Sequence, residues 1–166
     1  GGSVRIPASL TGIAALRPSV GRYSQIGVTP VSTTRDTVGP MAASVEQVAL
    51  LDAVLTEQSD TLPEISLQKL RLGVPRALFF SELDTETRDQ TEQLLQKLKS
   101  KGVQLVEANI PSLETLLSQS AFPIALYEVV RDLRKYLEDY NIGLTLEQLA
   151  AQTASPDVQA VFEQIL

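Results

Sequence analysis

The feature that most constrains the fold is a helix-forming segment flanked by two short apolar runs in the middle of the chain. Residues 70–74 and 103–106 have the length and composition of buried strands. Between them, Asp84 can cap the start of an amphipathic helix, and Gly102 can end it in the left-handed conformation. Two strands joined through one helix lie parallel, with a right-handed crossover. The sequence therefore predicts an α/β fold with a strand–helix–strand unit over residues 64–110, as part of a larger mixed sheet.

The segment before residue 44 has a different character, because it is rich in glycine and proline. It holds six of the nine glycines and four of the nine prolines. This composition favours short strands and constrained turns over long helices. We expect a short buried strand over residues 13–16 and a weaker extended segment over residues 26–31.

A first helix is predicted directly after this segment. Ser44 and Gln47 have the spacing of a capping box at the start of a helix that ends near Leu55. Asp52 lies at the edge of its buried face, where a carboxylate needs a partner or water. The apolar positions of that face are Val45, Val48, Ala49, Leu51 and Leu55.

Residues 112–166 are predicted to be mainly helical. Pro123 suits the first turn of a helix, and a single apolar stripe follows it. Thr145 and Gln148 have the spacing of a second capping box, and Pro156 opens a last helix. The stripe consists of Leu126, Val130, Leu133, Leu137 and Tyr140.

The composition excludes several classes of function. With a net charge of −6 and a pI near 4.7, the chain offers no basic surface to nucleic acid or to an anionic membrane. No apolar run approaches the roughly 20 residues that span a bilayer. The chain has neither histidine nor cysteine, so it cannot build a Ser–His–Asp triad, a Cys–His pair or a thiolate metal site. We expect no metal and no cofactor, and a cytoplasmic location, which suits a chain without cysteine.

A candidate nucleophile stands at the start of the sequence. Gly1 and Gly2 precede Ser3, and glycines let the backbone adopt conformations closed to other residues and let a substrate approach closely. Backbone amides at such a position can point at a developing oxyanion. Taken alone, however, these three residues are more typical of an ordinary loop.

The motifs that follow change this interpretation, because together they resemble one family. They are Gly1-Gly2-Ser3-Val4-Arg5-Ile6-Pro7-Ala8, Thr11-Gly12-Ile13, Leu16-Arg17-Pro18, Gly21-Arg22 and Gly39-Pro40-Met41-Ala42. The chain resembles the amidase signature family of serine hydrolases, most of all its indoleacetamide and mandelamide hydrolase branch. The resemblance is dense over residues 1–55 and only architectural over residues 70–110. Ala43 and Gln47 depart from the Arg and the acidic residue common in the family, on or beside a packing helix.

The resemblance implies a helix-flanked mixed β-sheet sandwich and a Ser–cis-Ser–Lys mechanism that hydrolyses a small, aromatic primary amide. Ser3 would be the nucleophile, and backbone amides at Gly1 and Gly2 would line the oxyanion hole. In the family, the lysine and the bridging cis-serine both precede the nucleophile. Residues 1–166 are therefore interpreted as a partial amidase domain that begins at its nucleophile motif and relies on an amino-terminal part of the same fold. Since a serine without a base is a poor nucleophile, we expect no amidase turnover from the isolated chain.

Other residues have candidate roles in binding or structure. Phe122 and Tyr127 are candidates for the pocket of an aromatic acyl group, with an ordinary place in the core as the alternative. Arg5 is expected to be a structural ion-pair partner, with the orientation of a substrate as the alternative. Arg35 and Asp36 are expected to form a buried salt bridge that fixes their loop, with a direct part in catalysis as the alternative.

Two other functions stay open at this point. One is a non-catalytic binding or scaffolding fragment, which an exposed sheet edge could assemble into a homodimer. The other is the glutamine-amidase subunit of a tRNA-dependent amidotransferase. The sequence of residues 34–36 favours the small-amide hydrolases over this subunit.

Overall fold

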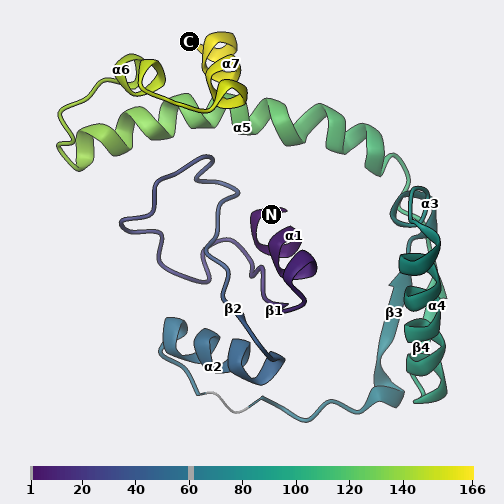
Figure 1. Cartoon of the computed structure of the whole chain (residues 1–166). Coiled ribbons are helices and arrows are strands. Elements are labelled where there is room, and N and C mark those ends of the chain that lie inside the picture. The colour runs from purple at the N-terminus through teal and green to yellow at the C-terminus, as the bar shows by residue number, and fades with distance from the viewer. Residues whose placement is uncertain (1, 60–61) are drawn as a thin grey trace. The chain divides into compact units, whose positions relative to one another are not determined.

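The computed structural model describes residues 2–59 and 62–166 and divides the chain into two compact units (Figure 1). One unit comprises residues 1–62 and 122–166, and the other comprises residues 63–121. Helices and small sheets occur together, so the predicted α/β class is confirmed.

The unit over residues 63–121 contains the predicted strand–helix–strand arrangement. Strands β3 and β4 are parallel, with Arg71 opposite Gln104. The Asp84 side chain caps α4 by accepting the Thr87 N–H at 2.8 Å. Gly102 has φ 96°, the left-handed conformation that the sequence predicts for it. The elements of this unit are η1 (Leu67–Lys69), β3 (Arg71–Val74), α3 (Arg76–Phe79), α4 (Thr85–Ser100), β4 (Gln104–Glu107) and the first part of α5 (Leu113–Asp139).

The other unit contains a two-stranded antiparallel sheet and several helices. Ala14 of β1 pairs with Ala42 of β2, which joins the two ends of the loop over residues 16–40. Its elements are α1 (Gly2–Thr11), β1 (Ala14–Ala15), β2 (Met41–Ala42), α2 (Val45–Thr56), the remainder of α5, α6 (Leu146–Ala151) and α7 (Pro156–Ile165).

The glycine-rich segment contains helix α1, whereas its composition predicts short strands and turns. Helix α1 spans ten residues, contains Pro7 and has Ala8 as its buried residue. Pro7 has no N–H to donate to the Ser3 carbonyl, so this helix lacks one of its internal hydrogen bonds. The extended segment predicted over residues 26–31 is also wrong, because the chain turns at Gly27, where φ is 79°.

Helix α2 begins where the sequence predicts, but its cap and its buried face differ. The Ser44 hydroxyl accepts the Gln47 N–H at 3.3 Å, whereas the Gln47 side chain accepts the Ala43 N–H instead of the Ser44 N–H. The capping box is therefore only half formed. Val48 is buried as predicted, but Val45 is 66% exposed. Leu51 and Leu55 are exposed as well.

Asp52 has the partner that the sequence predicts. The interaction links α2 to the loop that contains Arg22 and Tyr23. Arg22 donates to the carboxylate through Nε at 2.6 Å and through Nη2 at 2.5 Å, and the Tyr23 hydroxyl donates at 2.5 Å. These hydrogen bonds, from Arg22 first and Tyr23 second, lower the pKa of Asp52 to about 2. Tyr23 is buried, so the interaction fixes the aromatic ring as well as the loop.

Helix α5 begins at Leu113, so Pro123 lies inside it and not in its first turn as predicted. Val130, Leu133 and Leu137 of the predicted apolar stripe pack against α6 and α7, which lie along α5 in Figure 1, whereas Tyr140 is 45% exposed. Leu133, Leu137 and Leu146 form the buried centre of this cluster. Val129, Val130, Leu149 and Phe162 pack around it.

Two helix starts in this region provide a matched test of capping. Thr145 forms the complete capping box with Gln148 that the sequence predicts, whereas the Ser155 hydroxyl makes no capping hydrogen bond. We expect Thr145→Ala to lower the free energy of unfolding by about 1 kcal/mol, a typical value for the loss of a cap. Ser155→Ala is the control and should change it by much less. Urea unfolding followed by circular dichroism measures both changes. Equal losses of stability in the two variants would contradict the role of Thr145 as a helix cap.

Candidate functional site

Ser3 lies in the first turn of α1, with its side chain exposed to a shallow hollow of about 200 Å³. Gly2 begins the helix, and Gly1 lies outside the described residues. The hollow, which we call the Ser3 hollow, is also lined by loop residues between Arg17 and Val38. The structure therefore brings the predicted nucleophile next to the loop that carries Asp36.

Gly39 allows α1 to pack closely against the segment that leads into β2. A Cβ atom at this position would lie 2.6 Å from the Val4 side chain and 2.8 Å from the Leu16 carbonyl oxygen. No other residue fits there without a shift of the backbone. The Leu16 N–H also donates to the Pro40 carbonyl at 3.0 Å. The Gly39-Pro40 motif thus holds the helix that carries Ser3.

The Asp36 carboxylate binds backbone amides of its own loop, and Arg35, its expected partner in a buried salt bridge, is exposed. The Oδ2 atom of Asp36 accepts the N–H of Val31 at 2.7 Å and the N–H of Ser32 at 2.8 Å. Arg35, the expected partner, contributes its carbonyl oxygen, which accepts from Arg17 at 3.0 Å. The loop is therefore closed on the Asp36 carboxylate in a turn that the sequence alone did not indicate.

Two carboxylates of α5 bind the same loop from its other side. Glu128 accepts the Ser32 hydroxyl at 2.5 Å and the Thr34 hydroxyl at 2.8 Å. Asp132, one helical turn later, accepts the Thr33 N–H at 2.7 Å. Ser32 is only 2% exposed, and both carboxylates are buried. We call these two residues and their partners the α5 clamp.

Hydrogen bonds keep both carboxylates of the α5 clamp ionised. The Ser32 hydroxyl is the main cause of the lowered pKa of Glu128, with help from Thr34 and Arg131. Burial raises the pKa of Asp132, but hydrogen bonds from Arg131 and Thr33 outweigh it and lower the pKa overall. Arg131 contacts both carboxylates, at 3.3 Å from Glu128 and 2.7 Å from Asp132.

Three other residues with predicted roles, Phe122, Tyr127 and Arg5, do not belong to the α5 clamp. Phe122 is 75% exposed and Tyr127 is 72% exposed, so the alternative that they are core residues is wrong. Neither lines the Ser3 hollow, and their role in binding a substrate stays a prediction. Arg5 is exposed and forms no ion pair within residues 2–59 and 62–166, so its expected partner is not found there.

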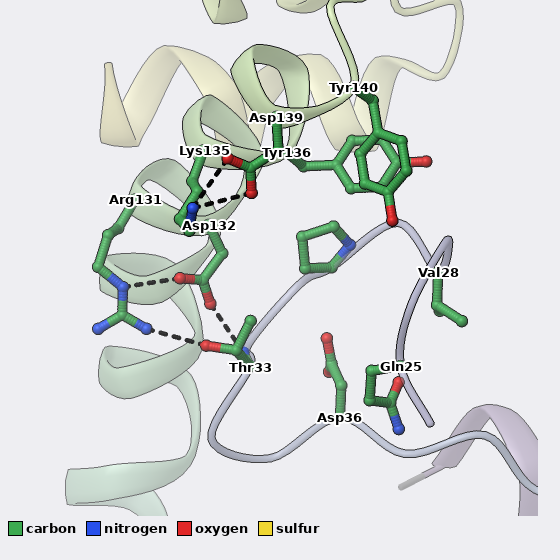
Figure 2. Close-up of a pocket in the computed structure, with 11 residues that line it drawn as sticks. Gln25, Val28, Thr33, Asp36, Arg131, Asp132, Lys135, Tyr136, Asp139 and Tyr140 are labelled. Atoms are coloured by element: carbon green, nitrogen blue, oxygen red, sulfur yellow. Dashed lines mark hydrogen bonds and ion pairs between the residues drawn. The ribbon is translucent and has the colours of Figure 1, made fainter. Parts of the chain in front are cut away.

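A second hollow of about 420 Å³, the α5 hollow, lies between α5 and the loop over residues 25–36 (Figure 2). It shares three lining residues with the Ser3 hollow, namely Gln25, Val28 and Asp36. The other lining residues are Pro30, Thr33, Arg131, Asp132, Lys135, Tyr136, Asp139 and Tyr140. Sequence reasoning missed this hollow, because its two walls come from segments about a hundred residues apart.

In the part of the chain that the structure describes, no cluster of acidic, histidine or cysteine residues could hold a metal ion. No described helix is both long enough and apolar enough to cross a membrane.

Comparison with known families decides what kind of protein carries this site. The amidase family matches residues 1–165, which is nearly the whole chain. The chain belongs to the amidase family. Ser3 lies within the residues that match this family.

Curated relatives of this amidase chain include the small-amide hydrolases. It is 39% identical over 158 residues to the indoleacetamide hydrolase of Rhizobium radiobacter, covering 95% of this chain and 34% of that protein. It is 39% identical over 168 residues to the mandelamide hydrolase of Pseudomonas putida, covering 100% and 32%. The predicted resemblance to this branch is confirmed. The chain spans about a third of the length of these relatives.

Solved amidase structures share the fold. A structure described as an amidase superposes with a TM-score of 0.67 at 27% identity, covering 99% of this chain and 39% of the other. The native peptide amidase of Stenotrophomonas maltophilia superposes with a TM-score of 0.72 at 24% identity, covering 99% and 36%. The second likeness concerns the fold alone. The amidase chain thus matches about a third of each solved chain.

The α5 clamp makes the stability of this amidase chain depend on pH. Because the folded state lowers the pKa of Glu128 below its ordinary 4.5, its contribution is present above that pH and is lost as the pH falls through the lowered value. We expect Glu128→Gln to lower the melting temperature at pH 7 and to make the loss of stability below pH 4.5 shallower. Thermal melts between pH 7 and pH 3 measure both effects.

Glu138→Gln is the matched control, since Glu138 is exposed on the same helix. It should leave the melting temperature and its dependence on pH close to those of the wild type. Equal pH profiles for the two variants would show that Glu128 does not stabilise the loop.

Proposed function

We propose that this chain supplies the nucleophile of an amidase that hydrolyses a small aromatic primary amide to a carboxylic acid and ammonia. The observation that carries the proposal is the exposure of Ser3 to a hollow at the start of α1, in a chain of the amidase family. The kinship with hydrolases named for indoleacetamide and mandelamide supports an aromatic acyl group.

The proposed reaction passes through an acyl-enzyme. The Ser3 hydroxyl oxygen attacks the amide carbon while a base takes the hydroxyl proton, and a tetrahedral oxyanion forms. The carbon–nitrogen bond then breaks, and the nitrogen leaves as ammonia after it receives that proton. Water attacks the resulting ester in the second half of the reaction, releasing the acid and restoring the Ser3 hydroxyl.

The start of α1 suits the stabilisation of the oxyanion. The first N–H groups of a helix have no partner inside the helix, and the helix dipole places partial positive charge there. Ser3 is in this first turn, next to Gly2, which leaves room for a substrate carbonyl. Removal of one oxyanion donor in hydrolases costs about 2.7–4 kcal/mol of transition-state stabilisation. We propose that the amides at Gly1 and Gly2 provide such donors.

The base that activates Ser3 is proposed to be a lysine outside this sequence, acting through a cis-serine that is also outside it. The unit that contains Ser3 holds a single lysine, Lys135. A hydrogen bond from its ammonium to Asp139 raises the pKa of Lys135, so this side chain stays protonated at neutral pH. A protonated lysine cannot accept the proton of Ser3. Because the isolated chain lacks a base for Ser3, we expect it not to hydrolyse amides.

A chimera tests this function directly. The segment of the Pseudomonas putida mandelamide hydrolase that matches this chain would be replaced by residues 1–166, and ammonia release from mandelamide and indoleacetamide would be measured. We expect hydrolysis by the chimera, and a loss of at least about 1,000-fold with Ser3→Ala, as for the removal of a catalytic serine in other hydrolases.

Two controls make the chimera interpretable. Circular dichroism and a cooperative thermal transition establish that the chimera and its Ser3→Ala variant are folded. Ser9→Ala, an exposed serine of the same helix, should retain activity. A folded chimera without hydrolysis, or one whose activity survives Ser3→Ala, would contradict the proposal.

A further inference from the structure

Arg17 lines the Ser3 hollow and belongs to the same segment of the fold as Ser3. The N–H of Ile13 donates to the Ala8 carbonyl of α1 at 3.1 Å, and β1 follows directly. Arg17 comes two residues after β1, which is paired with β2. Backbone hydrogen bonds therefore hold Arg17 in place relative to the helix that carries Ser3.

The guanidinium group of Arg17 binds two backbone carbonyls in separate parts of the chain. Its Nη1 donates to the Pro18 carbonyl at 3.0 Å, and its Nη2 donates to the Arg35 carbonyl at 3.0 Å. Two donors in a rigid planar fork determine the direction as well as the distance of their partners. Arg17 thus links the segment of Ser3 to a loop residue 18 positions further along the chain.

The loop that receives this hydrogen bond forms much of the wall of the Ser3 hollow, through residues between 25 and 38. It has no helix or strand of its own. Gln25, at one end of it, has a buried side-chain nitrogen without a hydrogen-bond partner among the described residues, which costs stability. The position of this wall therefore depends on hydrogen bonds from outside the loop. The α5 clamp supplies them at residues 32–34, and Arg17 supplies one at residue 35.

No carboxylate competes for the donors of Arg17. Within residues 2–59 and 62–166, no acidic side chain forms a salt bridge with it, whereas Arg22, Arg76, Arg131 and Arg134 each have such a partner. Hydrogen bonds from a charged donor are stronger than those between neutral groups. Both bonds of Arg17 are of this kind, and both accept at the backbone, so the side chain acts on the position of the chain itself.

We propose that Arg17 is a positioning residue for the reaction at Ser3. Its guanidinium fork fixes the loop wall of the Ser3 hollow relative to α1, so that a substrate lying against this wall presents its amide carbon to the Ser3 hydroxyl. Arg17 acts through the loop and does not itself touch the reacting atoms. This inference rests on the proposed function for the identity of the nucleophile.

Amide hydrogen exchange in the 166-residue chain tests the link between Arg17 and the loop. The N–H groups of Arg35 and Asp36 both donate to the Ser32 carbonyl, at 2.9 Å and 2.7 Å. We expect Arg17→Ala to raise their exchange rates about two- to tenfold, the usual net value of one hydrogen bond. The N–H of Leu149, in α6, is the internal control and should exchange at an unchanged rate.

The mandelamide hydrolase chimera tests the consequence for the reaction. Because a misplacement of about 1 Å can cost on the order of 100-fold in rate, we expect Arg17→Ala to lower kcat about ten- to 100-fold and to raise KM by less. Arg17→Lys keeps the charge but not the planar fork, so it should stay impaired. Added ethylguanidinium should restore part of the kcat of Arg17→Ala, whereas ethylammonium should not. A residue that contributes only to stability would give no such rescue.

Arg134→Ala is the control, because Arg134 pairs with the exposed Glu147 and lines neither hollow. It should leave kcat unchanged. Unchanged exchange at Arg35 and Asp36, full kcat in Arg17→Ala or Arg17→Lys, or equal rescue by the two cations would each overturn the proposal. An inactive wild-type chimera would contradict the proposed function and this inference with it. An active chimera that is insensitive to Arg17→Ala would contradict this inference alone.

Discussion

The site depends on two buried carboxylates that stand one turn apart on α5. Glu128 and Asp132 accept hydrogen bonds from Ser32, Thr33 and Thr34, in a loop that has no helix or strand of its own. A loop without regular structure leaves its amides and hydroxyls unpaired unless side chains satisfy them. The α5 clamp does this from one side and Asp36 does it from the other. Both hollows are lined by the loop that is held in this way.

Local signals in the sequence were sufficient for much of the fold. The Asp84 cap and the left-handed Gly102 depend on residues close together in the chain, and both are predicted correctly. The parallel pairing of β3 and β4 is also predicted correctly, because one helix connects the two strands. The same holds for the capping box at Thr145 and for the buried part of the α5 stripe. Periodicity and end signals are determined by neighbours within a few residues, so a single sequence contains them.

The misses have a common physical origin in contacts between distant segments. Proline and glycine in residues 1–43 argued against α1, yet the helix forms there, and Val4 on it packs against the distant Gly39. Likewise, nothing near Glu128 in the sequence indicates Ser32, which lies 96 residues away. Gln25 gave no signal at all, because an unpaired amide is visible only once its surroundings are folded.

The central claim is that Ser3 is the nucleophile of an amidase, held at the start of α1 beside the clamped loop. The most direct measurement is covalent labelling of the active chimera with a fluorophosphonate, which loses fluoride to an activated serine oxygen. Peptide mapping by mass spectrometry then locates the phosphonyl group. The account predicts a single adduct on Ser3, formed in step with the loss of amide hydrolysis. Inactivation with the adduct on another residue, and Ser3 unmodified, would contradict it.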